Sequence, residues 1–207
     1  TSLFLKNADI DFSDPLTPYS KIYEDLYFSK QGVEEESDFV FLKGNNLKKR
    51  FSNLSARESF SIAELGLGFG INFLNTWRLW IKNAPKDSLL NYFAIENSPV
   101  SSKDLEAFII NNFSLEPLTK EFLSKYPLNC RGWHRIYFSE GSVNLTVAYN
   151  DAEDSLSSLS KQQAKFDAFF LDGFSPRRNS LMWSKEIFRN LRKLSHNKTS
   201  LSIVNGH

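Results

Sequence analysis

Two acidic residues stand directly after strongly apolar runs of this chain, in positions suited to bind polar groups of a ligand. Glu96 follows Leu89–Ile95, and Asp172 follows Phe166–Leu171. If both runs are parallel strands of one sheet, the two carboxylates meet at its carboxyl edge, where open α/β folds bind ligands. Glu96 is then placed to accept hydrogen bonds from ribose hydroxyls. The alternative is a surface acid that simply closes a strand.

A strand, a glycine-rich turn and a helix would form the centre of such a site. Ile62–Leu65 is predicted to be a short buried strand, and Ile71–Lys82 a helix. Between them lie three glycines spaced G-x-G-x-G, which is shorter than the dinucleotide fingerprint G-x-G-x-x-G. With an acid just before it, this spacing resembles the loop of S-adenosylmethionine-dependent methyltransferases. A glycine-rich turn without a ligand is the alternative.

Each glycine has a separate expected role. Gly66 permits a tight turn off the strand because glycine readily adopts positive φ. Gly68 leaves room for a ligand to approach the backbone, and Gly70 lets the helix pack closely against the sheet. Glu64 lies two residues before the first glycine, so we expect its carboxylate to face the crevice.

A third acid, Asp151, follows the predicted strand Asn144–Tyr149. At this edge of the sheet it could reach the amino group of an adenine. Asp151 or Asp154 could instead cap the helix that starts nearby. The two roles are compatible.

The other segments predict an α/β fold. Trp133–Phe138 and Asn144–Tyr149 are expected to form a hairpin. Further strands are predicted at Asp38–Leu42 and Thr199–Val204, and helices at Pro99–Asn112, within Leu115–Arg131, and from Arg177 to about Leu194. We therefore expect a Rossmann-like methyltransferase sheet over residues 60–207, an N-terminal extension over 1–59 that packs on it to form effectively one domain, and a missing C-terminal hairpin.

Composition bounds the possible classes of protein. The 207 residues are 41% hydrophobic and include one cysteine, which predicts a packed core without an internal disulfide. One free thiol and no recognisable signal peptide lead us to expect a cytoplasmic protein. No apolar run approaches the roughly 20 residues that span a bilayer, so no membrane partner is expected. The net charge of +1 would confine any nucleic-acid contact to a local patch. The three histidines are scattered, so no metal site is expected.

Three separated motifs resemble the methyltransferase part of the MnmC family of tRNA wobble-uridine modification enzymes. They are Asp25-Leu-Tyr-Phe-Ser29, Glu64-x-Gly-x-Gly-x-Gly-x-Asn-Phe73 and Phe170-Leu-Asp-Gly-Phe-Ser-Pro-Arg-Arg-Asn-Ser-Leu-Met-Trp183. The resemblance extends from about Asp14 to about Val204. It implies transfer of a methyl group from S-adenosyl-L-methionine to the aminomethyl nitrogen of 5-aminomethyl-2-thiouridine in tRNA, giving the methylaminomethyl form.

The bifunctional members of that family also carry a flavin-dependent oxidase domain. This chain shows no second glycine fingerprint and is too short for such a domain. We therefore expect the stand-alone form, with a separate enzyme supplying the aminomethyl group.

The resemblance also implies roles for individual residues. Asp172 would face the amine, as a base or an orienting group, and Phe174 and Tyr27 would wall the pocket or stack on the uracil, with core packing as the alternative for both rings. Arg177 and Arg178 would contact anticodon phosphates, with an ordinary basic surface as the alternative. The implied cofactor-binding set is Glu64, Gly66, Gly68, Gly70, Asn72, Phe73, Glu96, Asn97, Asp151 and Asp172.

Two other functions fit the same residues. The chain could methylate an amine of a small molecule or protein, because a fold does not determine its substrate. It could instead be a non-catalytic Rossmann-like module that binds RNA or another partner, although such a module has no need of this set of acids and glycines. An NAD-dependent oxidoreductase is disfavoured by the glycine spacing.

Overall fold

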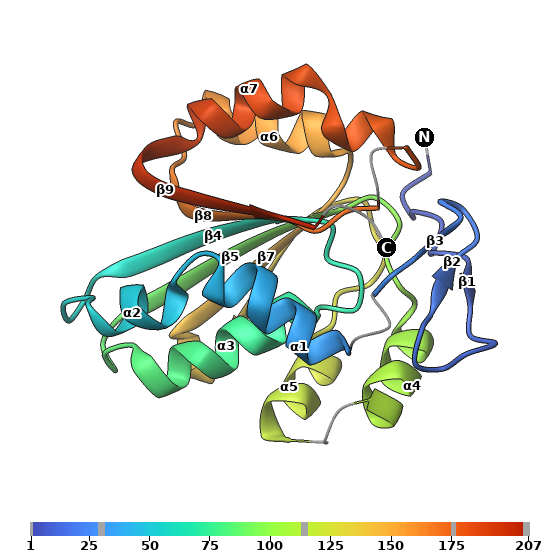
Figure 1. Ribbon diagram of the computed structural model, residues 1–207, viewed down its shortest axis with the longest axis horizontal. Helices are drawn as coiled ribbons and strands as arrows, with labels where there is room; N and C mark the ends of the chain where they lie inside the picture. The colour runs from blue at the N-terminus through green and yellow to red at the C-terminus, as the bar shows by residue number, and fades with distance from the viewer. Residues whose placement is uncertain (1, 29–31, 113–115, 175–176, 205–207) are drawn as a thin grey trace.

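The computed structural model describes residues 2–28, 32–112, 116–174 and 177–204. Its centre is a six-stranded sheet with the order β6-β7-β5-β4-β8-β9 (Figure 1). The strands are β4 (Ser59–Leu65), β5 (Leu89–Glu96), β6 (Gly132–Phe138), β7 (Val143–Tyr149), β8 (Phe166–Leu171) and β9 (Ser195–Ile203). Only β6 pairs antiparallel within this sheet, in the predicted hairpin with β7. The expected Rossmann-like α/β sheet is confirmed.

The central strands are buried on both faces because they are nearly continuous apolar runs. β4 lies between β5 and β8, with Leu65 level with Ile95 on one side and with Leu171 on the other. The residues that follow these three strands therefore emerge side by side. This register brings Gly66, Glu96 and Asp172 to one edge of the sheet, as their positions in the sequence predicted.

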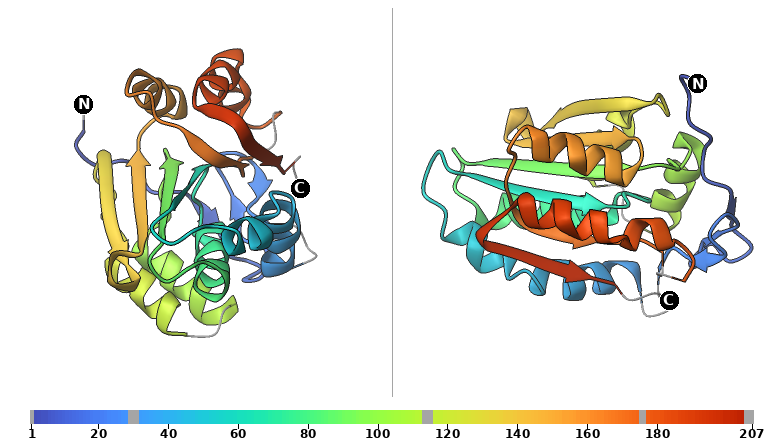
Figure 2. Two further views of the ribbon diagram at one scale, coloured as in Figure 1. Left: turned by 90° about the vertical axis from the view of Figure 1, so that its left-hand side faces the viewer. Right: turned by 90° about the horizontal axis from the view of Figure 1, so that it is seen from above.

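Helices cover both faces of the sheet (Figures 1 and 2). On one face, α6 (Ala152–Lys161) and α7 (Lys185–Lys193) bury Leu156, Leu159, Ile187 and Leu191 against the strands. The other face is covered by α2 (Leu47–Ser52), α3 (Ile71–Asn83), α4 (Ser102–Asn112) and α5 (Pro117–Lys125). No helix of the described residues is long and apolar enough to cross a membrane.

The N-terminal residues add a small sheet and two helices. β1 (Ile10–Asp11), β2 (Tyr19–Ser20) and β3 (Asp25–Leu26) pair antiparallel and lie near the carboxyl edge of the main sheet (Figure 1). α1 (Val33–Ser37) leads directly into η1 (Asp38–Lys43). Phe41 and Phe51 are buried in the same cluster as the core of the sheet. The division between residues 59 and 60 stays a prediction.

Two predicted elements were wrong. Asp38–Leu42 was expected to be a strand, but η1 is a π-helix, because a short apolar run fits a helix as well as a strand. It buries Phe41 and leaves Phe39 exposed. The helix expected from Arg177 is instead a 3₁₀ turn, η3 (Ser180–Trp183), followed by α7. Ser184 separates them because its side chain accepts a hydrogen bond from the Ile187 amide and so starts a new helix.

Candidate functional site

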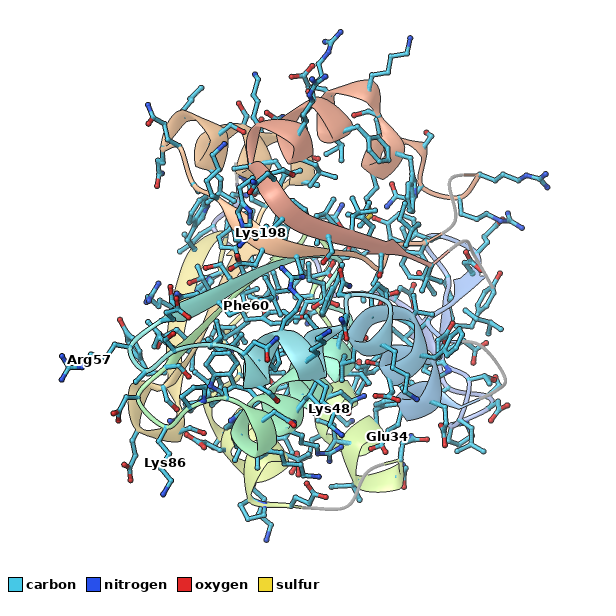
Figure 3. The ribbon with its side chains drawn as sticks, turned by 60° about the vertical axis from the view of Figure 1, so that its left-hand side comes forward. Glu34, Lys48, Arg57, Phe60, Lys86 and Lys198 are labelled. Atoms are coloured by element: carbon cyan, nitrogen blue, oxygen red, sulfur yellow. The ribbon has the colours of Figure 1, made fainter. Side chains whose placement is uncertain are left out.

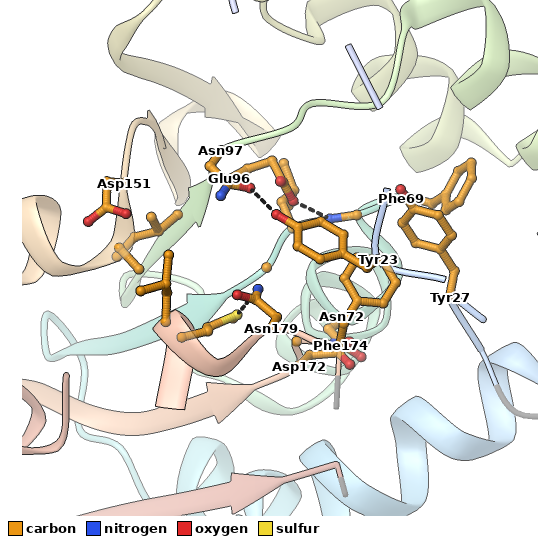
Figure 4. A pocket seen from close by; sticks show the side chains of 18 of the residues that line it. Tyr23, Tyr27, Phe69, Asn72, Glu96, Asn97, Asp151, Asp172, Phe174 and Asn179 are labelled. Carbon is orange, nitrogen blue, oxygen red and sulfur yellow. Dashed lines mark hydrogen bonds between the residues drawn. The ribbon is translucent and has the colours of Figure 1, made fainter. Parts of the chain in front are cut away.

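A cavity of about 290 Å³ opens at the carboxyl edge of the sheet (Figure 4). Its walls are the glycine loop, the ends of β5, β7 and β8, and the N-terminal segment around β3. The size is near the lower end of typical ligand pockets, about 300–1,000 Å³. The predicted site residues that line it are Tyr27, Gly66, Gly68, Asn72, Glu96, Asn97, Asp151, Asp172 and Phe174.

The glycine loop holds its shape through close backbone contacts. Gly66 has φ +91°, and a Cβ atom there would lie 2.3 Å from the backbone oxygen of Asp172. Gly68 has φ +53°, and its amide donates a hydrogen bond to Glu96. At position 66, only glycine allows both the positive φ and the close approach to the Asp172 backbone oxygen. The loop and the end of β8 are therefore fixed relative to each other.

Gly70 acts differently from the prediction. It adopts φ +75° at the start of α3, and a Cβ atom there would lie 2.6 Å from the ring of Phe122. Phe122 belongs to α5, so Gly70 admits an aromatic ring of a neighbouring helix rather than close packing on the sheet. It does not line the cavity.

Glu96 lines the cavity, and backbone amides hold both of its carboxylate oxygens. One oxygen accepts from the Gly68 amide at 3.1 Å and the other from the Ser98 amide at 2.8 Å. Burial raises the pKa of Glu96, and these backbone hydrogen bonds oppose the shift. A carboxylate fixed by backbone donors retains acceptor capacity for the hydroxyl groups of a ligand.

The position of Asp151 is compatible with both of the roles considered for it. Its side chain accepts hydrogen bonds from the amides of Glu153 and Asp154 at the start of α6, which confirms the cap. The residue also lines the cavity. Contact with an adenine stays a prediction.

Asp172 lines the cavity and is joined to a polar network that continues into the buried interior. The Asn72 amide nitrogen donates to Asp172 Oδ2 at 2.5 Å and to Glu64 Oε1 at 2.7 Å. The Tyr92 hydroxyl donates to the other oxygen of Glu64 at 2.8 Å. Burial, offset by the Asn72 hydrogen bond and reinforced by the charge of Glu36, raises the pKa of Asp172 to about 7. Asp172 therefore changes its charge near neutral pH.

The predicted orientation of Glu64 was wrong. Its side chain is completely buried and does not line the cavity, because Asn72 and Tyr92 hold both of its oxygens beneath the loop. Burial and the nearby Asp172 raise the pKa of Glu64 well above its ordinary value. The residue anchors Asn72 instead of facing the crevice.

Phe73 is also placed away from the cavity. It is fully buried, and its ring packs against Trp77, Tyr92 and Phe122. It lies on the side of α3 that faces the core, so the predicted contact with a cofactor is wrong in this structure.

Aromatic rings form the wall of the cavity nearest the N-terminal segment (Figure 4). Tyr23 stacks on Phe174 with ring centroids 4.5 Å apart, and Tyr27 meets Phe174 edge-on at 5.1 Å. The Tyr23 hydroxyl donates to Asn97 at 3.3 Å. The sequence reasoning missed Tyr23, although its position four residues before Tyr27 in an aromatic, acidic segment was a usable signal.

The two arginines after Phe174 lie at the surface. Arg177 and Arg178 are exposed, and Arg178 forms an ion pair of 2.8 Å with Glu24 of the N-terminal segment. This pair links the N-terminal segment to the segment that follows β8. Contact between these arginines and RNA phosphates stays a prediction.

The polar and apolar groups that line the cavity fit a nucleoside with a charged tail. Glu96 offers oxygen acceptors for a ribose, Leu67, Ile95 and Ala152 offer apolar surface, and the backbone approaches closely at Gly66 and Gly68. Asp172 stands at the far end with a carboxylate for an amine. Within the described ranges no three His, Cys, Asp or Glu residues cluster as a metal site.

Comparison with known proteins agrees with this geometry. Residues 114–203 match a family described as S-adenosyl-L-methionine-dependent methyltransferase, which indicates S-adenosyl-L-methionine as the cofactor. The structure resembles a crystal structure of MnmC2 from Aquifex aeolicus with a TM-score of 0.72, over 95% of this chain and 59% of that chain. At 18% identity, this similarity supports the fold alone.

The sequence relatives are more informative about the family than the structural match is. The chain is 41% identical over 184 residues to the tRNA 5-methylaminomethyl-2-thiouridine biosynthesis bifunctional protein MnmC of Hahella chejuensis, covering 89% of this chain and 29% of that protein. It is 35% identical over 202 residues to the protein of the same name from Marinomonas sp., covering 98% of this chain and 29% of that protein. The chain thus spans less than a third of either relative. Over that shared segment, the chain is similar to these MnmC proteins, and its residues 114–203 match the S-adenosyl-L-methionine-dependent methyltransferase family.

Proposed function

We propose that this chain transfers a methyl group from S-adenosyl-L-methionine to the aminomethyl nitrogen of 5-aminomethyl-2-thiouridine at the wobble position of tRNA. The observation that carries the proposal is the placement of Asp172. It shares one cavity with Glu96 and the glycine loop, and Asn72 holds its carboxylate. The names of the sequence relatives supply the substrate. We place the reaction in the cytoplasm, with another enzyme making the amine.

Several residues of the chain would hold the cofactor. Glu96 would accept hydrogen bonds from the ribose hydroxyls, and Asp151 would accept one from the adenine amino group. Gly66 and Gly68 leave the backbone open to the amino-acid tail. The bound cofactor supplies an electrophilic methyl group on a sulfonium, so the protein mainly has to position the acceptor nitrogen.

The acceptor amine must reach the reaction without its extra proton. A free alkylamine is mostly protonated at pH 7, as the lysine reference pKa of about 10.4 shows. Asp172 can attract the ammonium form, accept its proton and orient the remaining lone pair. Its pKa of about 7 suits this role because the group can both take up and release a proton near neutral pH. Tyr23, Tyr27 and Phe174 give the uracil ring flat apolar surfaces.

The direct test is methylation of tRNA that carries 5-aminomethyl-2-thiouridine, followed by mass spectrometry of its nucleosides. Wild-type protein should produce the methylaminomethyl nucleoside. Asp172→Asn should bind S-adenosyl-L-methionine within a few-fold of wild type and lose at least about a hundredfold in rate. Normal turnover by Asp172→Asn would contradict the proposed role of Asp172 in methyl transfer.

The assay also separates the alternatives. Methylation of a free alkylamine or a protein lysine, with none on tRNA, would assign the chain to another amine substrate. If isothermal titration detects no binding of S-adenosyl-L-methionine to the protein, the chain would be assigned as a non-catalytic module. Glu96→Gln serves as the cofactor control, because it should weaken cofactor binding while retaining the shape of the side chain.

A further inference from the structure

A shallow, solvent-open depression lies on the outer side of α7, outside the site described above. It has a volume of about 410 Å³ and is lined by Trp183, Lys185, Phe188, Arg189 and Arg192. The rings of Trp183 and Phe188 lie with centroids 6.4 Å apart. We call these five residues the α7 groove.

Helical geometry explains why these side chains share one surface. Positions 185, 188, 189 and 192 follow the i, i+3, i+4, i+7 spacing that places residues on one face of a helix. The other face buries Ile187 and Leu191 against the sheet. Phe188 is not needed for that core, and 40% of its surface is exposed. The helix therefore presents an aromatic ring together with cations to solvent.

The positive charge of the groove is largely uncompensated. Arg189 pairs with Glu186 at 3.0 Å. Lys185 and Arg192 form no ion pair with any other residue that the structure describes. On a chain with a net charge of only +1, this is a local basic patch of the kind that binds an anionic partner.

The groove is joined to the candidate active site through η3. Leu181 and Met182 of this turn line the first cavity, and the next residue, Trp183, lines the α7 groove. The Trp183 indole nitrogen donates a hydrogen bond of 3.1 Å to the backbone oxygen of Phe174. A chain-like ligand that leaves the first cavity over η3 would reach the groove directly.

We propose that the α7 groove binds the RNA strand beside the modified nucleotide, with Lys185 and Arg192 on phosphates and the exposed ring of Phe188 against a base. This inference rests on the proposed function, because it takes tRNA as the ligand. Cations that follow a phosphate backbone and aromatic rings that stack on bases are the two components of single-strand RNA binding. An acidic protein segment would satisfy the cations, whereas every nucleotide of an RNA strand brings both a phosphate for a cation and a base for the ring.

The test compares two double variants that each remove two positive charges. Lys185→Ala with Arg192→Ala changes the groove. Lys48→Ala with Lys86→Ala is the matched control, because both lysines are exposed and lie far from α7 (Figure 3). Binding of the tRNA is measured over a range of salt concentrations, and titration with S-adenosyl-L-methionine checks that both variants remain folded.

The groove variant should raise the Kd for tRNA at least fivefold at moderate salt. Its slope of log K against log salt should be shallower by about 1.4, since each of the two lost phosphate contacts contributes roughly 0.7 on a single strand. The control variant should change the Kd and slope less than half as much. Phe188→Ala should raise the Kd about fivefold or more without changing the slope.

The outcomes separate this inference from the proposed function. If wild-type protein methylates tRNA and the groove variant binds it like the control, the groove inference is overturned and the proposed function stands. If wild-type protein binds no tRNA, both the groove inference and the proposed function are contradicted. Competition by polyglutamate as strong as that by tRNA at equal charge would assign the groove to an acidic protein and overturn the RNA assignment.

Discussion

At the scale of single residues, the site depends on how Asn72 connects the buried carboxyl group of Glu64 with the half-buried one of Asp172. One amide nitrogen donates to both Glu64 and Asp172, and Tyr92 fixes the far side of Glu64. A buried network of this kind stabilises a single arrangement when each member is bonded. Glu64 can therefore affect Asp172 without touching a ligand.

Replacement of Asn72 by alanine should alter the pH dependence of methyl transfer. The Asn72 hydrogen bond lowers the pKa of Asp172 against the effect of burial, so its loss should move the rise of kcat to higher pH and reduce the rate about tenfold or more. Tyr92→Phe is the control. It removes a partner of Glu64 but keeps the Asn72–Asp172 bond, and should leave the midpoint of the profile closer to wild type. Identical pH profiles for Asn72→Ala and wild type would refute this link.

Asp172 should also make stability depend on pH. Its native pKa of about 7 lies above the ordinary value of 3.8, so between these values the native state binds more protons than the unfolded state. Stability therefore falls as pH rises through this window. Asp172→Asn cannot ionise, so its Tm relative to wild type should be higher at pH 8 than at pH 5 by a few degrees. Thermal unfolding at both pH values measures this.

Asp87→Asn, in an exposed loop, is the matched control for that comparison. It removes the same charge without removing a buried carboxyl group. An equal change in relative Tm for both variants between pH 5 and pH 8 would count against a special contribution of Asp172.

At the scale of elements, the sequence predicted the strands and helices that carry the site better than the detailed contacts. The apolar runs at Ile62–Leu65, Leu89–Ile95 and Phe166–Leu171 became adjacent strands because continuous apolar runs are buried on both faces. The register of these strands places Glu96 and Asp172 at the carboxyl edge of the sheet. The partner that approaches Gly70, Phe122, is 52 residues away in sequence, so no local pattern could identify it.

Side-chain direction was harder to predict than position. Glu64 and Phe73 lie within the expected strand and helix, yet both face the interior. Which face of a strand end or a first helical turn is buried depends on Tyr92, Phe122 and other distant partners. Tyr23 was missed for the same reason, because its stacking on Phe174 joins segments about 150 residues apart.

The turn after β4 allows a test of how much close backbone approach matters. Gly66→Ala should reduce stability by about 2 kcal/mol or more and weaken S-adenosyl-L-methionine binding, because the strain of positive φ and the clash of the new Cβ atom with the Asp172 backbone oxygen act together. Gly141 has a similar φ of +92° with nothing within 4 Å of a Cβ atom. Gly141→Ala therefore carries the backbone cost alone. Equal losses in chemical denaturation of the two variants would show that the contact with Asp172 is unimportant.

At the scale of the whole molecule, the cavity is assembled from both ends of the described chain. Tyr23 and Tyr27 come from the N-terminal segment, and Asp172 and Phe174 from the end of β8. The ion pair of Arg178 with Glu24 is exposed, and such pairs contribute little, about 0–1 kcal/mol. The N-terminal segment is held by aromatic contacts of Tyr23 and Tyr27 and by hydrogen bonds such as that of Tyr23 to Asn97, and a ligand in the cavity would add contacts to these tyrosines.

Cofactor binding should consequently protect the N-terminal segment from proteolysis. Lys21 is exposed between β2 and β3, two residues before Tyr23, and trypsin can reach it only when the segment opens locally. A ligand that contacts Tyr23 and Tyr27 lowers the open population, so saturating S-adenosyl-L-methionine should slow cleavage at Lys21 about tenfold or more. Lys161, exposed at the end of α6 and outside the cavity lining, should be slowed far less. Timed digestion with mass spectrometry measures both sites in one sample, and equal protection would mean that the ligand stabilises the whole fold without engaging the N-terminal segment.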